Sequence, residues 1–358
     1  MKICFFADGG SIHTVRWCTH FQKLGHEVHL ISFNKVEIPN VKVHVVDVGK
    51  VNVSGGNWKV LFKFRKVKKL VAEISPDIFH SLYATSYGIT GALVGFHPYV
   101  ITALGTDVLI SPQQSKLYKA LLKFAFSKAD WITAMSDFMK KVIEEMGVAS
   151  DKVSTVPFGI DPAVFNSNTR NVPKDKFIVT STRNFEAIYN IPHLINAIAN
   201  IRNEIPNLQL NLIGAGSLKS ELEALIDIRK LNDHVKFLGK LSQPEIASIL
   251  NTSQVFVSVS LSDGNNISLN EAMACGTFCI ATEIPANIQW ITDSVNGFLV
   301  QIDDVDGLAG KIVEAYKRYD QLQEKAIPVN KKIILEKGIW STNMLVVENK
   351  YKSLILKK

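Results

Sequence analysis

The sequence contains few cysteines, and none of them has the spacing of a metal or redox site. Cys4, Cys18, Cys275 and Cys279 are the four in 358 residues, with no CxxC pair and no histidine partner at zinc spacing. Apolar residues surround each of them. We therefore expect reduced, buried thiols, which excludes a disulfide scaffold and a zinc module.

Long apolar runs are also missing. The longest stretches, such as residues 88–96 and 121–126, fall far short of the ~20 residues that a membrane-spanning helix needs. At the N-terminus, the apolar run is too short for a signal peptide and meets Asp8 at once. This pattern predicts a cytoplasmic protein.

Two common nucleotide-binding motifs are absent. No GxxxxGK[ST] loop occurs, which excludes a P-loop NTPase. The turn Asp8-Gly9-Gly10-Ser11 lacks the third glycine of a dinucleotide fingerprint, so NAD binding is not expected. Gly9 and Gly10 precede an expected helix and suit a phosphate, although such a pair is also common in plain strand-to-helix turns.

The chain does contain β-rich runs that alternate with amphipathic segments from end to end, which predicts an α/β protein. We expect strands at 2–7, 27–32, 42–47, 77–80, 98–102, 131–133, 153–156, 177–182, 208–213, 234–238, 254–258, 277–281 and 297–300. We expect helices at 13–24, 58–74, 83–95, 115–128, 136–146, 191–204, 217–230, 243–250, 268–275 and 304–325.

The length of the chain predicts two domains. A polar stretch at residues 166–176 interrupts the alternation, which then restarts. We therefore expect two doubly wound, Rossmann-like domains at 1–168 and 169–334. A last helix at about 335–358 has no following strand to cover and needs another surface for its apolar positions: Trp340, Leu345, Val346, Tyr351 and Leu354.

The positive charge is concentrated in the first half. The chain has a net charge of +7; residues 1–165 carry 19 basic and 13 acidic side chains, and residues 166–358 carry 21 and 20. A phosphate-bearing partner or an anionic membrane surface suits the first half, and ordinary solubility charge is the alternative. We expect no nucleic-acid partner.

The most informative stretch is residues 258–276. A strand ends in a loop where Asp263 and Glu271 lie eight residues apart, and Ser268 is expected to begin a short helix. Free N–H groups at the helix start form an anion site, and the carboxylates flank it as hydroxyl acceptors, which suits a sugar nucleotide. The alternative is a capping box, in which Glu271 only closes its own helix against Ser268.

Asp263, Glu271 and the following Ala-Met-Ala-Cys-Gly resemble the acidic signature of family-4 retaining glycosyltransferases. Weaker matches follow the family's order over nearly the whole chain: Ser11 to Thr14, Gly25 to Val28, Ser136, Pro157 to Asp161, Leu212 to Gly216, Val235 to Gly239 and Asn296 to Val300. The resemblance implies the GT-B architecture, with two Rossmann-like domains facing across a cleft and the last helix returning to the first domain.

The resemblance also implies roles for single residues. Glu271 would accept hydrogen bonds from the donor ribose, Asp263 would hold hydroxyls of the transferred sugar, and Arg183 would clamp the diphosphate. The remaining expected contacts with the donor are made by Gly9, Gly10, Gly214, Gly216, Phe237, Leu238, Asn265, Asn266, Ile267 and Ser268.

Three positions depart from the family pattern. Asp263 stands where the family usually has glutamate, Tyr189-Asn190 stands near the usual Lys-Gly, and Leu104 replaces a histidine. Asp107 or His13 could supply the polar contact that this histidine would make; the alternative for His13 is a capped or packed histidine near a helix start.

The implied activity is metal-independent transfer of a hexose from a UDP-sugar or GDP-sugar to a glycan or lipid-linked acceptor, in polysaccharide or glycoconjugate synthesis. No cofactor and no metal are expected, because no His, Cys or carboxylate cluster has metal spacing. A sugar-nucleotide epimerase and a non-catalytic sugar-nucleotide-binding partner are the alternatives.

Residues 58–71 predict a basic amphipathic helix in the first domain. Its expected core face is Val60, Phe64, Val67 and Val71, which leaves Trp58, Phe62 and six basic residues. Such a helix can lie on an anionic membrane, which would place the protein peripherally on the inner face. The alternative is a helix packed on the sheet, with its lysines in water.

Overall fold

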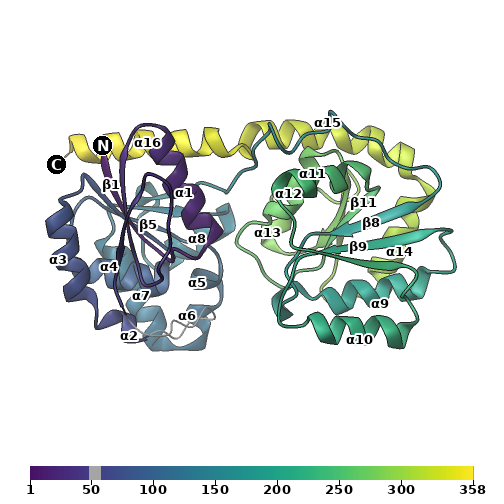
Figure 1. Ribbon diagram of the computed structural model, residues 1–358, viewed down its shortest axis with the longest axis horizontal. Coiled ribbons are helices and arrows are strands. Elements are labelled where there is room, and N and C mark those ends of the chain that lie inside the picture. Colours follow the sequence, from purple (N-terminus) through teal and green to yellow (C-terminus); the bar gives the residue numbers. More distant parts are fainter. Residues whose placement is uncertain (48–57, 358) are drawn as a thin grey trace. The chain divides into compact units, whose positions relative to one another are not determined.

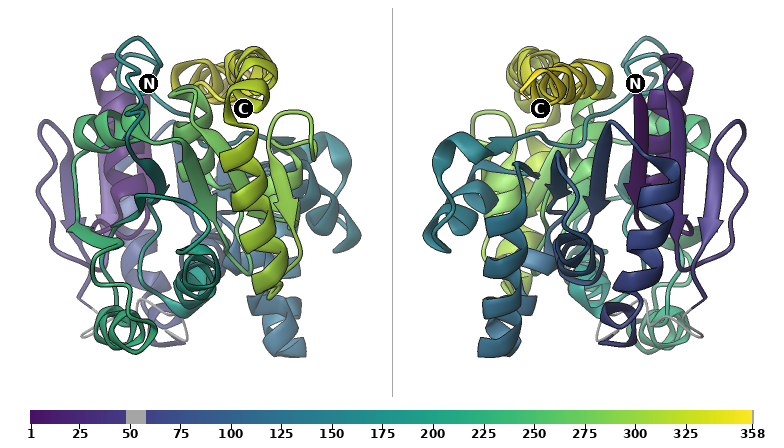
Figure 2. Two further views of the ribbon diagram at one scale, coloured as in Figure 1. Left: turned by 90° about the vertical axis from the view of Figure 1, so that its right-hand side faces the viewer. Right: turned by 90° about the vertical axis from the view of Figure 1, so that its left-hand side faces the viewer.

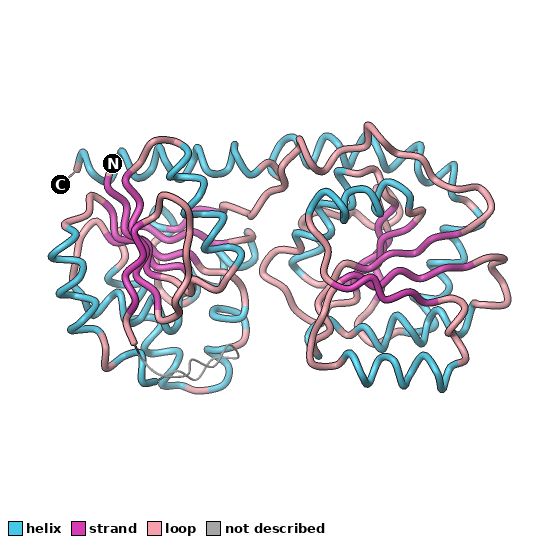
Figure 3. Tube along the Cα trace, in the orientation of Figure 1, coloured by secondary structure: helices cyan, strands magenta, loops and turns pink. Residues whose placement is uncertain are grey.

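The computed structural model describes residues 1–47 and 58–357. The chain forms two compact units. The first unit contains Met1–Val156 and Met344–Lys358, and the second contains Pro157–Asn343. Figure 3 shows that the strands of each unit gather in one sheet with helices around it.

The boundary between the units lies earlier than we expected. Residues 157–168, expected in the first domain, belong to the second unit. Ile160 pairs with Ile339 in a short parallel bridge, and Phe165 is buried in the same core cluster as Leu269. The polar stretch at 166–176 therefore follows a segment that is already packed in the second unit.

Among the described residues of the first unit, seven parallel strands form a sheet in the order β3-β2-β1-β4-β5-β6-β7. The strands are β1 Lys2–Phe6, β2 Glu27–Ser32, β3 Lys42–Val45, β4 Ile78–Leu82, β5 Tyr99–Thr102, β6 Trp131–Ala134 and β7 Val153–Thr155. Central strands such as β1 and β4 are buried on both faces, which explains the apolar run from Ile3 to Phe6 in β1; β4 also buries the polar residues His80 and Ser81.

The helices of the first unit connect these strands (Figure 1). They are α1 Ile12–Lys23, α2 Trp58–Leu61, α3 Phe64–Ile74, a π-helix at Ala84–Gly88, α4 Ile89–Val94, α5 Thr106–Leu109, α6 Ser111–Gln114, α7 Lys116–Lys128, α8 Asp137–Glu145 and a 3-10 turn at Ser150–Lys152. The hydroxyl of Ser136 caps α8 by accepting from the Met139 N–H at 3.2 Å, as the sequence predicts.

The helix expected over 58–74 is broken. The chain turns at Phe62 and Lys63, where the Lys63 N–H donates to the Val60 carbonyl at 3.0 Å. Val60, Val67 and Val71 are buried as expected, and Phe62 is 82% exposed at the turn. The side chains of Trp58 and Lys59 lie outside the described part of the chain.

The last helix, α16 Trp340–Leu356, completes the first unit from Met344 onward. Met344, Val347 and Tyr351 are buried, whereas Leu345 and Val346, expected as apolar contacts, are about half exposed. The helical spacing explains this difference, because residues three and four apart share one face and Leu345 and Val346 fall beside it.

Buried polar contacts fix α16 to the first sheet. Tyr351 hydrogen-bonds His80 of β4, and its ring stacks on Phe21 of α1, 5.4 Å between centroids. The other ring nitrogen of His80 hydrogen-bonds the Thr102 hydroxyl at 2.7 Å. Complete burial lowers the pKa of His80 to about 3, so the imidazole is neutral at physiological pH.

The second sheet has six parallel strands in the order β10-β9-β8-β11-β12-β13. In the left view of Figure 2, strands of this sheet are coloured teal to green and helices lie beside them. The strands are β8 Phe177–Ser181, β9 Leu208–Ile213, β10 Val235–Gly239, β11 Val255–Ser258, β12 Phe278–Thr282 and β13 Phe298–Val300. The other elements are a 3-10 turn at Ala187–Tyr189, α9 Ile191–Ile201, α10 Lys219–Arg229, α11 Gln243–Thr252, α12 Ile267–Ala274, α13 Pro285–Ile288, α14 Val305–Lys317 and α15 Tyr319–Lys337.

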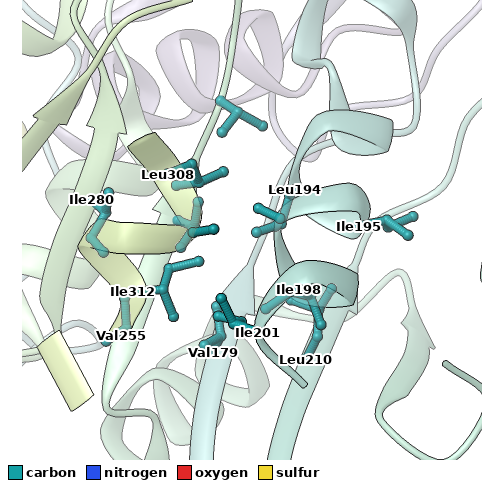
Figure 4. Packing of buried hydrophobic residues seen from close by; sticks show 14 of the residues in the cluster. Val179, Leu194, Ile195, Ile198, Ile201, Leu210, Val255, Ile280, Leu308 and Ile312 are labelled. Carbon is teal, nitrogen blue, oxygen red and sulfur yellow. The ribbon is translucent and has the colours of Figure 1, made fainter. Parts of the chain in front are cut away.

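Helices α9 and α14 pack against each other over the second sheet. Figure 4 shows Leu194 and Ile198 of α9 gathered with Leu308 and Ile312 of α14 above Val179 of β8. All five side chains are fully buried, and each such burial contributes about 1.5–3 kcal/mol to folding. This core fixes β8, the strand whose carboxyl end leads into the candidate site.

All four cysteines are buried and free, as the sequence predicts. Burial raises the pKa of the Cys18 thiol to about 12, so this thiol is not a thiolate at neutral pH. No helix in the described ranges, 1–47 and 58–357, is both long and apolar enough to cross a membrane.

Candidate functional site

The second sheet reverses its strand order between β8 and β11, which are hydrogen-bonded neighbours. Open parallel sheets bind ligands at the carboxyl ends of the strands at such a switch point. The chain after β8 carries Arg183, and the chain after β11 carries Asp263 and leads into α12, which carries Glu271. The topology therefore places these three residues after neighbouring strands at the same edge of the second sheet.

Arg183 is the centre of this group. Its guanidinium donates to Asp263 Oδ2 at 2.6 Å and to Asn266 Oδ1 at 2.9 Å, and its carbon lies 4.2 Å from the centre of the Tyr189 ring. Only 7% of Arg183 is exposed. A planar cation with its remaining N–H groups at the mouth of a parallel sheet can bind a diphosphate by paired hydrogen bonds.

Two glycines hold the segment that carries Arg183. A Cβ added to Gly214 would lie 2.6 Å from the Arg183 carbonyl oxygen, and one added to Gly216 would lie 2.3 Å from that of Phe185. The Phe185 N–H donates to the Ala215 carbonyl at 3.1 Å, which joins the two loops. The glycine loop after β9 therefore positions the Arg183 segment by close backbone contact.

Asn266, and not Ser268, caps α12. Its side-chain oxygen accepts from the Leu269 N–H at 3.2 Å, and its amide nitrogen donates to Ser258 and Asn287 at 2.9 Å. Ser268 lies inside the helix and its hydroxyl donates to the Thr182 carbonyl. The capping box that the sequence offered as an alternative role for Glu271 is therefore wrong, because Ser268 is not the N-cap.

Glu271 lies in the second turn of α12 and is 8% exposed. Next to the helix start, Asn265 links three parts of the unit. Its amide donates to the Phe158 carbonyl at 2.9 Å, and its oxygen accepts from the indole N–H of Trp290 at 2.9 Å. The side chain of Asn265 therefore braces the loop before α12.

Two backbone N–H groups expected to face a donor are engaged within this loop. The Asn265 N–H donates to Asp263 Oδ1 at 3.2 Å, and the Ile267 N–H donates to the Asn265 carbonyl at 3.0 Å. On β10, which carries two of the expected donor contacts, Phe237 packs edge-on against Phe185 with 5.6 Å between ring centres, and Leu238 is half-buried beside it.

The remaining expected site residues belong to the first unit. The Gly9 N–H donates to the Ser32 hydroxyl and the Gly10 N–H to Asp8 Oδ1, each at 2.9 Å. His13 is half-buried in the first turn of α1. The Gly9 and Gly10 turn is therefore held to its own unit by both of these N–H groups.

Asp107 is fully buried and accepts backbone N–H bonds from Ala84 at 2.6 Å, Gly105 at 2.8 Å and Leu104 at 3.1 Å. Burial raises its pKa, and these hydrogen bonds partly oppose that shift. The carboxylate thus ties the loop after β5 to the π-helix after β4.

Sequence reasoning missed two tyrosines. Tyr189 was noted only as the residue in place of a lysine, whereas its ring supports Arg183. Tyr83 follows β4 with a φ of 87°, rare for a non-glycine residue, and its hydroxyl hydrogen-bonds Thr106 at 3.0 Å. An aromatic residue close after a predicted site arginine was the available signal for the first, and no sequence signal marks the second.

Within the described residues, no group of three or more His, Cys, Asp or Glu side chains is arranged to hold a metal ion.

Comparison with known proteins gives a consistent result. Residues 2–136 match the family model described as glycosyl transferase 4-like, and residues 165–332 match the model described as glycosyl transferases group 1. N-acetyl-alpha-D-glucosaminyl L-malate synthase of Bacillus anthracis is 26% identical over 88% of this chain and 86% of its own. The phosphatidyl-myo-inositol mannosyltransferase of Mycolicibacterium smegmatis is also 26% identical, over 86% of this chain and 81% of its own.

Among solved structures, Anabaena HepE in complex with UDP superposes with a TM-score of 0.81 at 18% identity, covering 99% of this chain and 100% of that one. At this identity the likeness shows the fold alone. The two matched models together span most of the chain, and Asp263 of the acidic signature meets Arg183 at the switch point of the second sheet. The chain is therefore a glycosyltransferase of GT-B architecture and belongs to family 4.

Proposed function

We propose that the protein is a retaining, metal-independent glycosyltransferase that moves a hexose from a UDP-sugar or GDP-sugar to a glycan or lipid-linked acceptor. The observation that carries this proposal is the buried Arg183 guanidinium beside Asp263 at the switch point. The relative that acts on phosphatidyl-myo-inositol and the HepE complex with UDP support the acceptor class and the donor class. Synthesis of a cell-surface polysaccharide or glycoconjugate fits such a reaction.

The proposed chemistry requires no separate general base. As the bond between the sugar C1 and the leaving diphosphate oxygen breaks, another oxygen of that diphosphate takes the proton of the acceptor hydroxyl. The acceptor oxygen bonds C1 on the face that the diphosphate leaves. Arg183 stabilises the charge that builds up on the diphosphate, because its donors are already oriented before reaction.

The other site residues have binding roles in this proposal. Glu271 accepts from the ribose hydroxyls of the donor, and Asp263 turns to the hydroxyls of the transferred sugar. The side chains of Phe237 and Leu238 border the base. Asn265 and Asn266 act by shaping the loop before α12, and Gly214 and Gly216 by placing the Arg183 segment.

A thermal-shift screen against UDP, GDP, ADP and their common sugar conjugates, with and without magnesium, tests the donor assignment. A ligand at one hundred times its dissociation constant adds about 2.7 kcal/mol of stability. We expect one nucleoside diphosphate to stabilise the protein selectively without magnesium. A folded sample that responds to none of these compounds, or only when magnesium is present, would contradict the proposal.

We further propose that the enzyme works at the inner face of a membrane. The supporting feature is the positive charge on α3 and α7. Both helices contact α4, which lies between them in the contact pattern and has no charged residue. Nine basic residues and one acid, Glu73, give residues 62–74, 89–94 and 116–128 a net charge of +8, against +7 for the whole chain. The nine are Lys63, Arg65, Lys66, Lys68, Lys69, Lys116, Lys119, Lys123 and Lys128.

Exposed apolar side chains accompany these charges. Phe62 before α3 is 82% exposed, Leu117 on α7 is 58% exposed and Leu93 on α4 is 37% exposed. Basic residues attract anionic lipid headgroups at about 1 kcal/mol each, and apolar side chains between them can enter the headgroup region. We call the surface formed by α3, α4, α7 and Phe62 the basic helix layer.

We expect the protein to float with vesicles that contain anionic lipid and not with zwitterionic ones, and to detach as salt is raised. Changing Lys66→Glu and Lys68→Glu together should weaken this binding at least tenfold, because both side chains are exposed in the basic helix layer. Lys331→Glu with Lys332→Glu, an exposed pair on α15, is the matched control and should bind as wild type. Equal losses in the two double variants would show a general charge effect and remove the layer as the docking surface.

A further inference from the structure

Arg183 is the most buried arginine or lysine among the described residues, and its partners differ in kind. Asn266 and Tyr189 are neutral, whereas Asp263 carries a negative charge. The Nε atom of Arg183 is also buried, with no hydrogen-bond partner among the described residues. The guanidinium is therefore held by one ion pair, one amide and the face of one aromatic ring.

The backbone that carries Tyr189 is fixed independently of Arg183. The Tyr189 N–H donates to the Glu186 carbonyl at 2.9 Å, which closes the short 3-10 turn. The Ile188 carbonyl accepts from the Leu261 N–H at 2.9 Å, and the Asn190 amide donates to Asp303 at 3.1 Å. Because its neighbours on both sides are tied to other loops, Tyr189 presents a stable surface to the guanidinium.

Asp263 is the partner that a bound diphosphate would disturb. A diphosphate on Arg183 brings further negative charge next to the Asp263 carboxylate, and like charges at this distance repel strongly away from bulk water. The Asp263 side chain is 17% exposed, twice as much as the 8% of the Arg183 side chain. Apart from the ion pair, the carboxylate accepts only a long bond among the described residues, from the Asn265 N–H to Oδ1 at 3.2 Å, so a diphosphate on Arg183 would favour its turning away. Neither Asn266 nor Tyr189 has a charge reason to move.

We propose that Tyr189 is a positioning residue for sugar transfer, whose ring holds the Arg183 guanidinium in place while Asp263 is exchanged for the donor diphosphate. This inference rests on the proposed donor site. A cation is attracted to the face of an aromatic ring, and the attraction is stronger where water is excluded, as it is around Arg183. Arg183, oriented by this ring, would then bind the diphosphate without a second cation, since Tyr189 stands near the position where the family usually has lysine.

The test compares Tyr189→Leu with Tyr189→Phe, which keeps the ring. Calorimetry measures the affinity for UDP and for uridine, with GDP and guanosine in parallel. We expect Tyr189→Leu to bind the diphosphate about tenfold more weakly and the nucleoside within twofold of wild type, because only the diphosphate uses Arg183. Tyr189→Phe should match wild type for both ligands.

Several results would overturn the inference. Tyr189→Leu could bind the diphosphate as well as wild type, or it could lose the nucleoside and the diphosphate equally, which would indicate a general disturbance of the loop. A loss in Tyr189→Phe equal to that in Tyr189→Leu would assign the effect to the hydroxyl. If wild type itself binds none of these diphosphates, the donor assignment fails and the role of Tyr189 fails with it.

Discussion

Replacing Arg183 by alanine is expected to lower kcat/KM for sugar transfer about a hundredfold, a loss of about 2.7 kcal/mol of transition-state stabilisation. The change removes the cation that would stabilise the leaving diphosphate. It also leaves the partly buried Asp263 carboxylate without its 2.6 Å partner, which adds a second negative charge facing the donor. Steady-state transfer measured with the donor that the thermal-shift screen selects provides the check.

Two further variants show whether the loss belongs to the site. Arg183→Lys keeps the charge but cannot make the paired hydrogen bonds of a guanidinium, so we expect an intermediate rate. Arg202→Ala removes an arginine of the same unit whose guanidinium donates to the Ala199 and Arg229 carbonyls, and it should retain wild-type transfer. Near-normal activity in Arg183→Ala would refute the proposed site.

Gly216→Ala removes no polar group, yet among such changes we expect it to distort the site most. The new Cβ would lie 2.3 Å from the Phe185 carbonyl oxygen and 2.5 Å from its carbon. Backbone at that distance must move, so the segment from Arg183 to Phe185 would shift. We expect at least a tenfold loss of transfer and a destabilisation of about 2 kcal/mol, measured by denaturant unfolding.

Gly310 provides the matched control. It lies within α14, and a Cβ added there meets no atom within 4 Å. Gly310→Ala should therefore stabilise the protein by up to about 1 kcal/mol and leave transfer unchanged, because alanine is the better helix former. Equal behaviour of the two variants would mean that the close contact at Gly216 does not position the site.

Much of the fold could be predicted because strands buried in a parallel sheet consist mainly of consecutive apolar residues. Apolar runs such as Ile3 to Phe6 and Phe177 to Val179 are buried on both faces, so their position needs no knowledge of their neighbours. The break at Phe62 and Lys63 could not be predicted in this way. Val60, Val67 and Val71 are buried on both sides of the break, so the apolar pattern of the sequence is the same with or without it. Only the path of the backbone shows the turn.

The candidate site was predictable where topology alone brings residues together. Arg183 and Asp263 follow two strands that meet at a switch point, so their proximity follows from the strand order. The cap at Asn266 and the ring of Tyr189 depend on how two loops bend. Ser268 followed three residues later by Glu271 suggested a capping box with Ser268 as the N-cap. In the structure the N-cap is Asn266 and the helix begins at Ile267.

The contact between His80 and Tyr351 has a consequence for synthesis of the chain. The first unit needs Met344–Lys358, yet the whole of Pro157–Asn343 must be translated before that segment exists. At about 5–20 residues per second, this delay lasts roughly 10 to 40 s. During that time the face that later buries Tyr351, including Phe21 and His80, is uncovered in the nascent protein. The first unit therefore becomes complete only after the second unit has been translated, when residues from Met344 onward cover this face.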